Sequence, residues 1–211
     1  MRKRQGLTLV EVLLAVVVIV IVLFLLLAPH GGAREEARRV RCRNNLNQLA
    51  KGMVTYVHLW YPFPLGRGLR ADDFNGAEWL ASLYWTGVVP DPGVFICPSS
   101  PDTNESGRDL GTHRAIAGRF GSETVSYAGM HYRSLTDTDG SPKPGAIKEY
   151  FPPNLPMACD DTQGAINHGQ PDNGYMSVLF FDSHVEGRTN TELDVERAVG
   201  QRPGLLAQLR N

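Results

Sequence analysis

The sequence predicts an α+β fold in which a long N-terminal helix packs on a small, mainly antiparallel β-sheet with long loops. Apolar residues from Leu46 to Trp60 recur at spacings of three and four, which is typical of a helix with one buried face. Two later segments, Thr124–His131 and Met176–Phe181, are rich in strand-forming residues. The 22 glycines and 14 prolines are concentrated after Trp60, which predicts turns and long loops in that part.

The first predicted element is an apolar run, Leu7 to Ala28, that follows the basic residues 2–4 and Gly6. As a helix this run is about 33 Å long, enough to cross a hydrocarbon core of about 30 Å. A secretory signal peptide has a shorter apolar region followed by a small-residue cleavage site, and residues 28–31 match such a site poorly. Because the small residue Gly6 lies before the run, a cut there would leave the hydrophobic helix on the mature protein.

Glu11 is the one charged residue within this apolar run. A carboxylate in a membrane span costs roughly 2.5–3.5 kcal/mol at the helix centre and less toward the interface, so such groups usually have a partner. If subunits stack side by side as helices, Glu11 can neutralise the cationic amine of a neighbouring copy in a medium that screens charge weakly. The alternative is an isolated signal anchor whose Glu11 reaches the lipid headgroups.

The basic leader, the segment from Leu7 to Glu11 and the apolar run together resemble the class III leader of type IV pilins and type II secretion pseudopilins. In that family a membrane-embedded prepilin peptidase cuts after the glycine and methylates the new N-terminal amine. The resemblance implies cleavage between Gly6 and Leu7, methylation of Leu7 and a role for Glu11 in subunit assembly. It also implies a pilus or pseudopilus formed with other pilin or pseudopilin subunits. Phenylalanine or methionine is more usual where this chain has Leu7.

The basic residues on the two sides of the apolar run favour opposite orientations. Residues 2–4 favour a cytoplasmic N-terminus, but five arginines follow the run: Arg34, Arg38, Arg39, Arg41 and Arg43. Because the first cluster usually dominates and the peptidase of the family acts on the cytoplasmic face, we expect a single-pass inner-membrane protein with an extracytoplasmic globular domain. The predicted divisions are a leader (1–6), a transmembrane helix (7–28), a kink with the soluble half of the helix (29–60) and the globular domain (61–211).

The soluble half of the helix is predicted to follow an interruption at Pro29, Gly31 and Gly32 and to resume at Ala33. Its apolar stripe comprises Leu46, Leu49, Met53, Tyr56, Val57 and Trp60, and other faces carry Arg38, Arg41, Asn45, Gln48, Lys51 and Thr55. Residues 41–49, with Tyr56 and Phe63-Pro64, resemble a pilin-like subfamily. The arginines suit a solvated face, with lipid headgroups or nucleic acid as alternatives. A net charge of −1 leaves no dominant nucleic-acid footprint, so we expect no nucleic-acid partner.

The globular part is predicted to contain a short second helix over Ala77–Trp85 and its best central strand over Met176–Phe181. A turn at Asp182-Ser183 and a return strand, His184 to Gly187, follow. The segment Arg188–Leu209 is predicted to end in a short helix. Turn signals occur at residues 91–93, 138–142 and 151–154.

Three cysteines, Cys42, Cys97 and Cys159, leave the disulfide state open. Cys42 and Cys97 lie in stretches that resemble the subfamily pattern, so the resemblance favours that pair. The sequence leaves two alternatives open: a bond between Cys97 and Cys159, or no disulfide at all.

Residues 158–187 concentrate polar side chains that could bind a metal ion. Calcium takes six to eight oxygen ligands, and candidate carboxylates are Asp160, Asp161, Asp172 and Asp182, although the regular spacing of an EF-hand loop is missing. Zinc through His168, His184 and Asp182 is the weaker alternative, because two histidines sixteen residues apart do not specify a zinc site. We expect no resident cofactor, with calcium as the candidate if one binds.

The same residues favour a structural role over catalysis. His184 and Asp182 would need a positioned serine, and no Gly-x-Ser-x-Gly motif occurs, so we expect no enzyme activity. The pilin-like subfamily ends in a histidine, a spacer, an apolar strand and Asp-Gly-His-Val. This chain has His168, the strand and residues 182–185, with Ser183 where the glycine belongs. If the backbone at that position adopts the left-handed conformation, Ser183 is strained there.

Three functions from different classes remain at this point. A filament subunit requires Glu11 for assembly but not for membrane insertion. A membrane-anchored extracytoplasmic binding module would instead use the loops from Pro98 to Gly121 or from Lys143 to Pro156. An anchored hydrolase would depend on His184.

Overall fold

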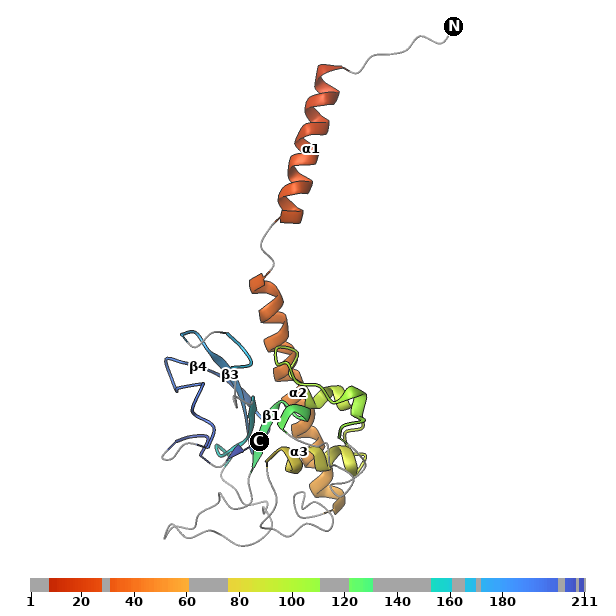
Figure 1. Ribbon diagram of the computed structural model, residues 1–211. Helices are drawn as coiled ribbons and strands as arrows, with labels where there is room; N and C mark the ends of the chain where they lie inside the picture. The colour runs from red at the N-terminus through yellow and green to blue at the C-terminus, as the bar shows by residue number, and fades with distance from the viewer. Residues whose placement is uncertain are drawn as a thin grey trace. The chain divides into compact units, whose positions relative to one another are not determined.

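The computed structural model describes residues 8–27, 31–60, 76–110, 122–130, 153–160, 166–169, 172–200, 204–207 and 209–210. The chain divides into two compact units, Met1–Arg34 and Glu35–Asn211. The N-terminal unit contains helix α1, and the second unit contains most of helix α2, helix α3 and the sheet (Figure 1).

Helix α1 comprises Leu9–Leu27 and begins with a reciprocal cap. The backbone N–H of Thr8 donates to Glu11 Oε2 at 2.8 Å, and the backbone N–H of Glu11 donates to Thr8 Oγ1 at 3.3 Å. This capping box satisfies two of the N–H groups that a helix start leaves without an intrahelical partner. The large apolar side chains from Leu9 to Phe24 are exposed within the single chain. In the part of the chain that the structure describes, no helix combines the length and the apolar character of a membrane span.

Helix α2 comprises Gly31–Trp60. It begins two residues before the predicted restart at Ala33, so Gly31 and Gly32 are helical, while Pro29 lies outside the described residues. The predicted apolar stripe is confirmed, because its members Leu46, Leu49, Met53 and Tyr56 are buried and Val57 is partly buried. The Trp60 side chain lies outside the described part.

Asn45, which was predicted to lie off the apolar stripe of this helix, has a buried side chain. Asn45 Nδ2 donates to the backbone oxygen of Ile96 at 3.0 Å and to the Tyr127 hydroxyl oxygen at 3.2 Å. A buried amide is stable where its hydrogen bonds are made, so Asn45 joins α2 to the following loop and to the sheet.

The predicted second helix is confirmed as α3, Gly76–Trp85, and eight of its residues are buried. At Gly52 of α2, a Cβ atom would lie 2.5 Å from Val89 Cγ2, just after α3, and 3.3 Å from Leu83 Cδ1 of α3. The turn predicted at residues 91–93 is the start of the short helix η1, Pro92–Phe95, whose first turn is capped by Asp91. Two further single turns are η2, Glu105–Gly107, and η4, Ser122–Thr124.

Among the described residues, five antiparallel strands form one sheet in the order β4-β3-β2-β1-β5. Their bounds are β1 Tyr127–Met130, β2 Pro156–Asp160, β3 Tyr175–Phe180, β4 Val185–Thr189 and β5 Leu209–Arg210. The two segments predicted as strands supply β1 and β3, and the predicted return strand is β4. Strand β2 was not predicted, because residues 156–160 contain a proline and no β-branched residue.

The predicted C-terminal helix within Arg188–Leu209 is wrong for the described residues, which form turns after β4 and then strand β5. Gly200 has a φ of +73°, which interrupts a helix, and its N–H donates to the Leu206 carbonyl oxygen at 2.9 Å. Leu209 and Arg210 instead pair with the open edge of β1, where backbone groups need hydrogen-bond partners.

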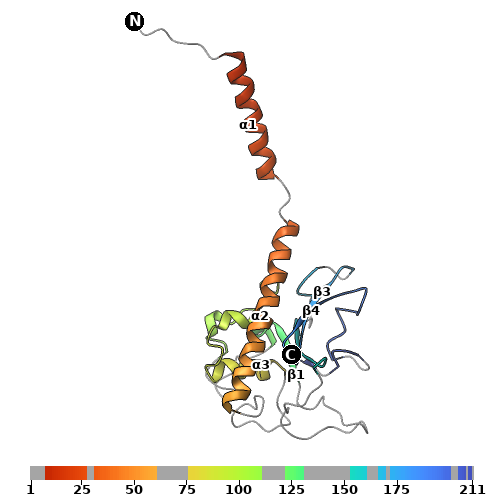
Figure 2. The ribbon, with the colours of Figure 1, turned by 180° about the vertical axis from the view of Figure 1, so that it is seen from behind.

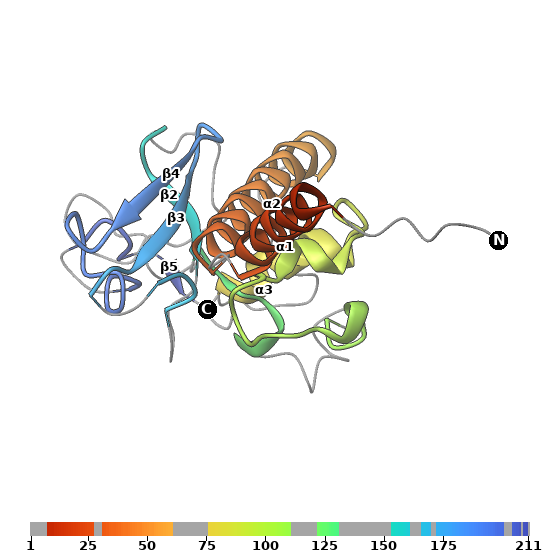
Figure 3. The same cartoon turned by 90° about the horizontal axis from the view of Figure 1, so that it is seen from above.

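In the second unit, α2 and α3 lie beside one another on one side of the sheet (Figures 2 and 3). The core is formed by the buried face of α2, by α3 and by β1 to β3. Two arginines of α2 also contact β3 and β4. Arg43 Nη2 donates to the Val185 carbonyl oxygen at 2.9 Å, and the Arg39 guanidinium lies 4.8 Å from the centre of the Tyr175 ring. The α+β prediction, with the helix on a small antiparallel sheet, is confirmed.

Candidate functional site

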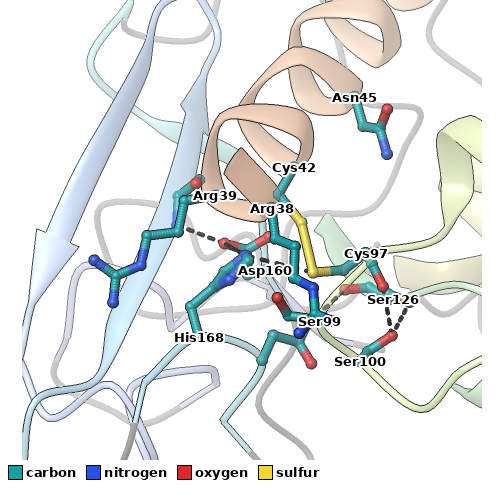
Figure 4. Close-up of a disulfide and its surroundings, with 12 residues drawn as sticks. Arg38, Arg39, Cys42, Asn45, Cys97, Ser99, Ser100, Ser126, Asp160 and His168 are labelled. Carbon is teal, nitrogen blue, oxygen red and sulfur yellow. Dashed lines mark hydrogen bonds and ion pairs between the residues drawn. A yellow bond between two sulfur atoms is a disulfide. The ribbon is translucent and has the colours of Figure 1, made fainter. Parts of the chain in front are cut away.

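A disulfide between Cys42 and Cys97 joins α2 to the segment after η1 (Figure 4). Their Cα atoms are 5.4 Å apart, within the usual range for a disulfide, and both side chains are fully buried. This is the pair that the subfamily resemblance favoured. Cys159 lies on β2, is buried and takes no part in the bond.

His168 lies directly beside this disulfide and is fully buried. Its Nε2 is 3.4 Å from Cys97 Sγ and 3.8 Å from Asp160 Oδ2. Its Nδ1 is 2.7 Å from Glu35 Oε1, and because a carboxylate only accepts, Nδ1 is the donor. The backbone of His168 bridges to β3, where the Tyr175 N–H donates to its carbonyl oxygen at 2.9 Å. The ring is therefore held from both nitrogens and from the main chain.

Asp160 ends strand β2 and is 1% exposed. The backbone N–H of Ser177, on the neighbouring strand β3, donates to Asp160 Oδ2 at 2.7 Å. This hydrogen bond fixes the orientation of the carboxylate. The same oxygen faces His168, so the sheet positions this carboxylate toward the disulfide.

Tyr127 on β1 closes the other side of the cluster. Its hydroxyl group donates to Cys42 Sγ at 3.5 Å and accepts from Asn45 Nδ2 at 3.2 Å. Burial, followed by the negative charge of Asp160, raises the pKa of Tyr127 well above its ordinary value, and the Asn45 hydrogen bond only partly opposes this. Tyr127 therefore stays protonated and acts as a donor to sulfur.

Glu35 connects the cluster to the first turns of α2 within the second unit. Its carboxylate accepts from Ser99 Oγ at 3.1 and 3.3 Å, and it lies within 4.0 Å of Arg38 and Arg39. Sequence reasoning missed Glu35, Asn45, Tyr127 and Ser177 as members of this site, because nothing in their local patterns shows that the fold brings them together.

Among the described residues, one group of side chains has the donor atoms for a metal ion: Cys42, Cys97, Asp160 and His168, whose ligand atoms all lie within 4.8 Å of one another. Of the carboxylates proposed for calcium, only Asp160 belongs to it. Asp172 and Asp182 are in no such group within the described ranges, and Asp161 lies outside them. His184 does not belong to this group either.

The turn from β3 to β4 contains the other predicted polar residues. Ser183 has a φ of +72°, so this serine occupies the left-handed conformation that favours glycine. The backbone N–H of His184 donates to Asp182 Oδ1 at 3.1 Å and lowers the pKa of Asp182, and the His184 ring adds to this effect. His184 also pairs with Glu186 at 3.3 Å and stacks on Phe180. These contacts support the structural interpretation of this segment as a hairpin turn.

The residues predicted to be processed, Gly6 and Leu7, lie outside the described part, and Glu11 is on α1. The prokaryotic N-terminal methylation motif matches residues 1–27. The family described as a protein of unknown function (DUF1559) matches residues 32–90, which include α2 from Gly32 onward and α3. No curated protein and no solved structure matches the chain.

The first of these matches carries all the residues on which the leader prediction depends, including Gly6, Leu7 and Glu11. The motif indicates a prepilin-like substrate of prepilin peptidase. The second match contains Cys42 and the buried stripe of α2. Together the two matches confirm the predicted resemblance of this chain to type IV pilins and pseudopilins.

Proposed function

We propose that this protein is a structural subunit that prepilin peptidase trims between Gly6 and Leu7 and that then assembles into a type IV pilus or a type II secretion pseudopilus. The function is assembly, and the protein is not an enzyme. The observation that carries the proposal is a carboxylate, Glu11, in the first turn of an otherwise apolar helix inside the methylation motif.

The exposed surface of α1 supports this function. Its large apolar side chains from Leu9 to Phe24 are all exposed in the single chain, and a contiguous apolar surface of this kind marks an interaction with lipid or with other helices. The complete apolar run, residues 7–28, is long enough to anchor the newly made chain in the inner membrane. In a filament the same surface would pack against the helices of neighbouring subunits, with the globular domains outside.

Glu11 supports an assembly role through its position in the capping box. Its carboxylate is turned back toward the start of the helix, where it accepts from the Thr8 N–H. Cleavage after Gly6 would create a cationic amine at Leu7, one residue before Thr8. A carboxylate held at this end of the helix can then pair with its own amine or with that of an adjacent copy, and the second pairing would set the axial register of the filament.

The first test is the mass of the mature N-terminus in a cell that contains prepilin peptidase. We expect a chain that begins at methylated Leu7, and Gly6→Leu should leave the leader attached. An intact Met1 in the unaltered protein would contradict the proposed processing.

The second test separates insertion from assembly. Glu11→Leu should stay membrane-inserted and be trimmed, but it should be absent from filaments sheared from cells that express the assembly machinery. Leu13→Ala, a neutral change on the same helix, is the matched control and should assemble. Normal filaments from Glu11→Leu would reject the assembly role and would favour the anchored binding module.

A further inference from the structure

The buried group of Cys42, Cys97, Asp160 and His168 has a chemistry that a filament subunit does not require. Two sulfurs, one imidazole nitrogen and one carboxylate oxygen converge there from α2, the segment after η1, β2 and the residues before β3 (Figure 4). We propose that, when the Cys42–Cys97 disulfide is reduced, these four side chains bind one Zn²⁺ ion. The disulfide and the zinc site are then two alternative states of the same cluster, and this proposal does not depend on filament assembly.

The donor set selects zinc over calcium. Thiolate and imidazole ligands favour Zn²⁺, and four ligands suit its tetrahedral coordination. Calcium prefers six to eight oxygen ligands, and this group offers a single carboxylate. All four residues are buried, which is typical of a closed structural zinc site with no position left for water.

Two distances from the His168 ring are close to those of a zinc tetrahedron. Zinc bonds of about 2.0–2.1 Å to nitrogen or oxygen and about 2.3 Å to sulfur give edges of about 3.6 Å between nitrogen and sulfur and about 3.4 Å between nitrogen and oxygen. His168 Nε2 lies 3.4 Å from Cys97 Sγ and 3.8 Å from Asp160 Oδ2. All four ligand atoms lie within 4.8 Å of one another. In a zinc tetrahedron the two sulfurs are about 3.8 Å apart, and reduction permits them to separate.

A set of outer hydrogen bonds already orients three of the four ligands. His168 Nδ1 donates to Glu35 Oε1 at 2.7 Å, which presents the other nitrogen, Nε2, to the centre of the group. This carboxylate–histidine arrangement usually supports a zinc-binding imidazole. Ser177 N–H holds the ligand oxygen of Asp160 at 2.7 Å. The Tyr127 hydroxyl donates to Cys42 Sγ at 3.5 Å, as expected for a group that stabilises a thiolate.

The charge balance is also favourable. Two thiolates and Asp160 bring three negative charges, of which Zn²⁺ neutralises two. Glu35 adds one more at the edge of the site, where Arg38 and Arg39 lie within 4.0 Å of its carboxylate. The two remaining negative charges are therefore accompanied by two guanidinium groups, which lie on the same helix as Glu35.

Conversion between the two states balances as follows. A phosphine reductant gives two electrons to the disulfide and takes an oxygen atom from water, so it becomes a phosphine oxide while each sulfur gains a proton. Zn²⁺ then replaces both thiol protons, which pass to solvent. Oxidation by a disulfide compound would reverse the change. The Cys42–Cys97 bond forms, the oxidant accepts two electrons and takes two protons from solvent to give two thiols, and the ion is released.

The test uses the full-length protein in detergent, reduced with a phosphine or left oxidised, and dialysed against chelator-buffered Zn²⁺. Metal analysis should give one zinc per reduced chain and none per oxidised chain. Co²⁺ in place of zinc should give the intense visible bands of tetrahedral coordination and a thiolate-to-cobalt charge-transfer band. No zinc uptake by the reduced chain, or a cobalt spectrum of six oxygen ligands, would overturn the site.

Variants identify the ligands. Cys42→Ser and His168→Gln should each weaken zinc binding about 100-fold or more. Glu35→Gln removes only the outer carboxylate charge and should weaken zinc binding about 10-fold to 100-fold. Cys159→Ala and His184→Gln are the matched controls, because they alter a cysteine and a histidine outside the group, and they should bind as the unaltered protein does. Circular dichroism of each variant verifies the fold. Unchanged affinity in folded Cys42→Ser, or loss of binding in Cys159→Ala, would refute the assignment.

Discussion

Glu35 and His168 are 133 positions apart in the sequence, yet Glu35 Oε1 lies 2.7 Å from His168 Nδ1. The contact joins the first turns of α2 in the second unit to the segment before β3. His168 is fully buried, whereas the Glu35 side chain is 28% exposed. The pair therefore links a partly solvent-exposed carboxylate to the buried disulfide cluster. A hydrogen bond between a carboxylate and a buried ring is stronger than one between neutral groups.

The first prediction concerns this pair. Glu35→Ala removes the acceptor for His168 and Ser99, so we expect a loss of about 1.5–3 kcal/mol in the free energy of unfolding, measured by urea titration of the full-length protein in detergent. Glu36→Ala alters the next residue of the same helix, which is mostly exposed, and should change stability by about 0.5 kcal/mol or less. Equal losses in the two variants would indicate a general effect on α2.

The second prediction concerns the disulfide. Its ends are separated by 55 positions, and closing a loop of that size restricts the unfolded chain. Replacing Cys42 and Cys97 together by serine should lower stability by about 2–4 kcal/mol in oxidising buffer with a chelator present. Reducing the unaltered protein under the same conditions should give a loss of the same order, and Cys159→Ala should leave this dependence on reductant intact. Stability that is independent of reductant would contradict a bond in the folded protein.

The third prediction concerns the close approach of α2 at Gly52 to Leu83 of α3 and to Val89, which follows α3. A Cβ at position 52 would lie 2.5 Å from Val89 Cγ2 and 3.3 Å from Leu83 Cδ1, so Gly52→Ala should destabilise by about 1–3 kcal/mol. Adding Val89→Ala should cost less in the Gly52→Ala background than alone, and a double-mutant cycle measures this coupling. Gly32→Ala is the control, because its Cβ meets nothing within 4 Å. Additive effects at positions 52 and 89 would show that the two side chains do not compete for space.

The fourth prediction concerns the left-handed serine in the hairpin. Ser183 has a φ of +72°, so Ser183→Gly should stabilise the protein by about 0.5–1 kcal/mol once the greater freedom of glycine in the unfolded chain is subtracted. Ser183→Ala keeps a Cβ and should give no gain. Comparing the midpoints of thermal unfolding of the two variants distinguishes these outcomes. If both variants gain the same stability, the effect comes from loss of the hydroxyl group and not from the backbone conformation.

The fifth prediction concerns pH. The backbone N–H of His184 lowers the pKa of Asp182 in the folded protein below its value of about 3.9 in an unfolded chain. A lowered folded-state pKa contributes stability above the unfolded value, and that contribution is lost as the pH falls through the folded value. Asp182→Asn should therefore melt below the unaltered protein at pH 6, and the difference should shrink steadily below about pH 4. A difference that is constant with pH would show that the charge is not its source.

The sequence predicted the helical and strand elements whose patterns are local. The buried stripe of α2 and the helix α3 follow from apolar spacing, and β3 follows from its run of apolar residues bounded by turn signals. Strands β2 and β5 could not be predicted in this way, and a helix was predicted in the segment that contains β5. Their backbone groups form hydrogen bonds with strands far away in the sequence, and this tertiary pairing overrides weak local propensity.

The same distinction between local patterns and tertiary structure applies to the candidate sites. Glu11 could be identified from the sequence alone, because one carboxylate in an apolar run is a local anomaly with a known energetic cost. The group of Cys42, Cys97, Asp160 and His168 depends on four separate parts of the fold, and its members came together only in the tertiary structure. Local sequence patterns report which face of an element is buried. They do not report which distant polar side chains share a buried volume, since that depends on strand order and on how the helix lies on the sheet.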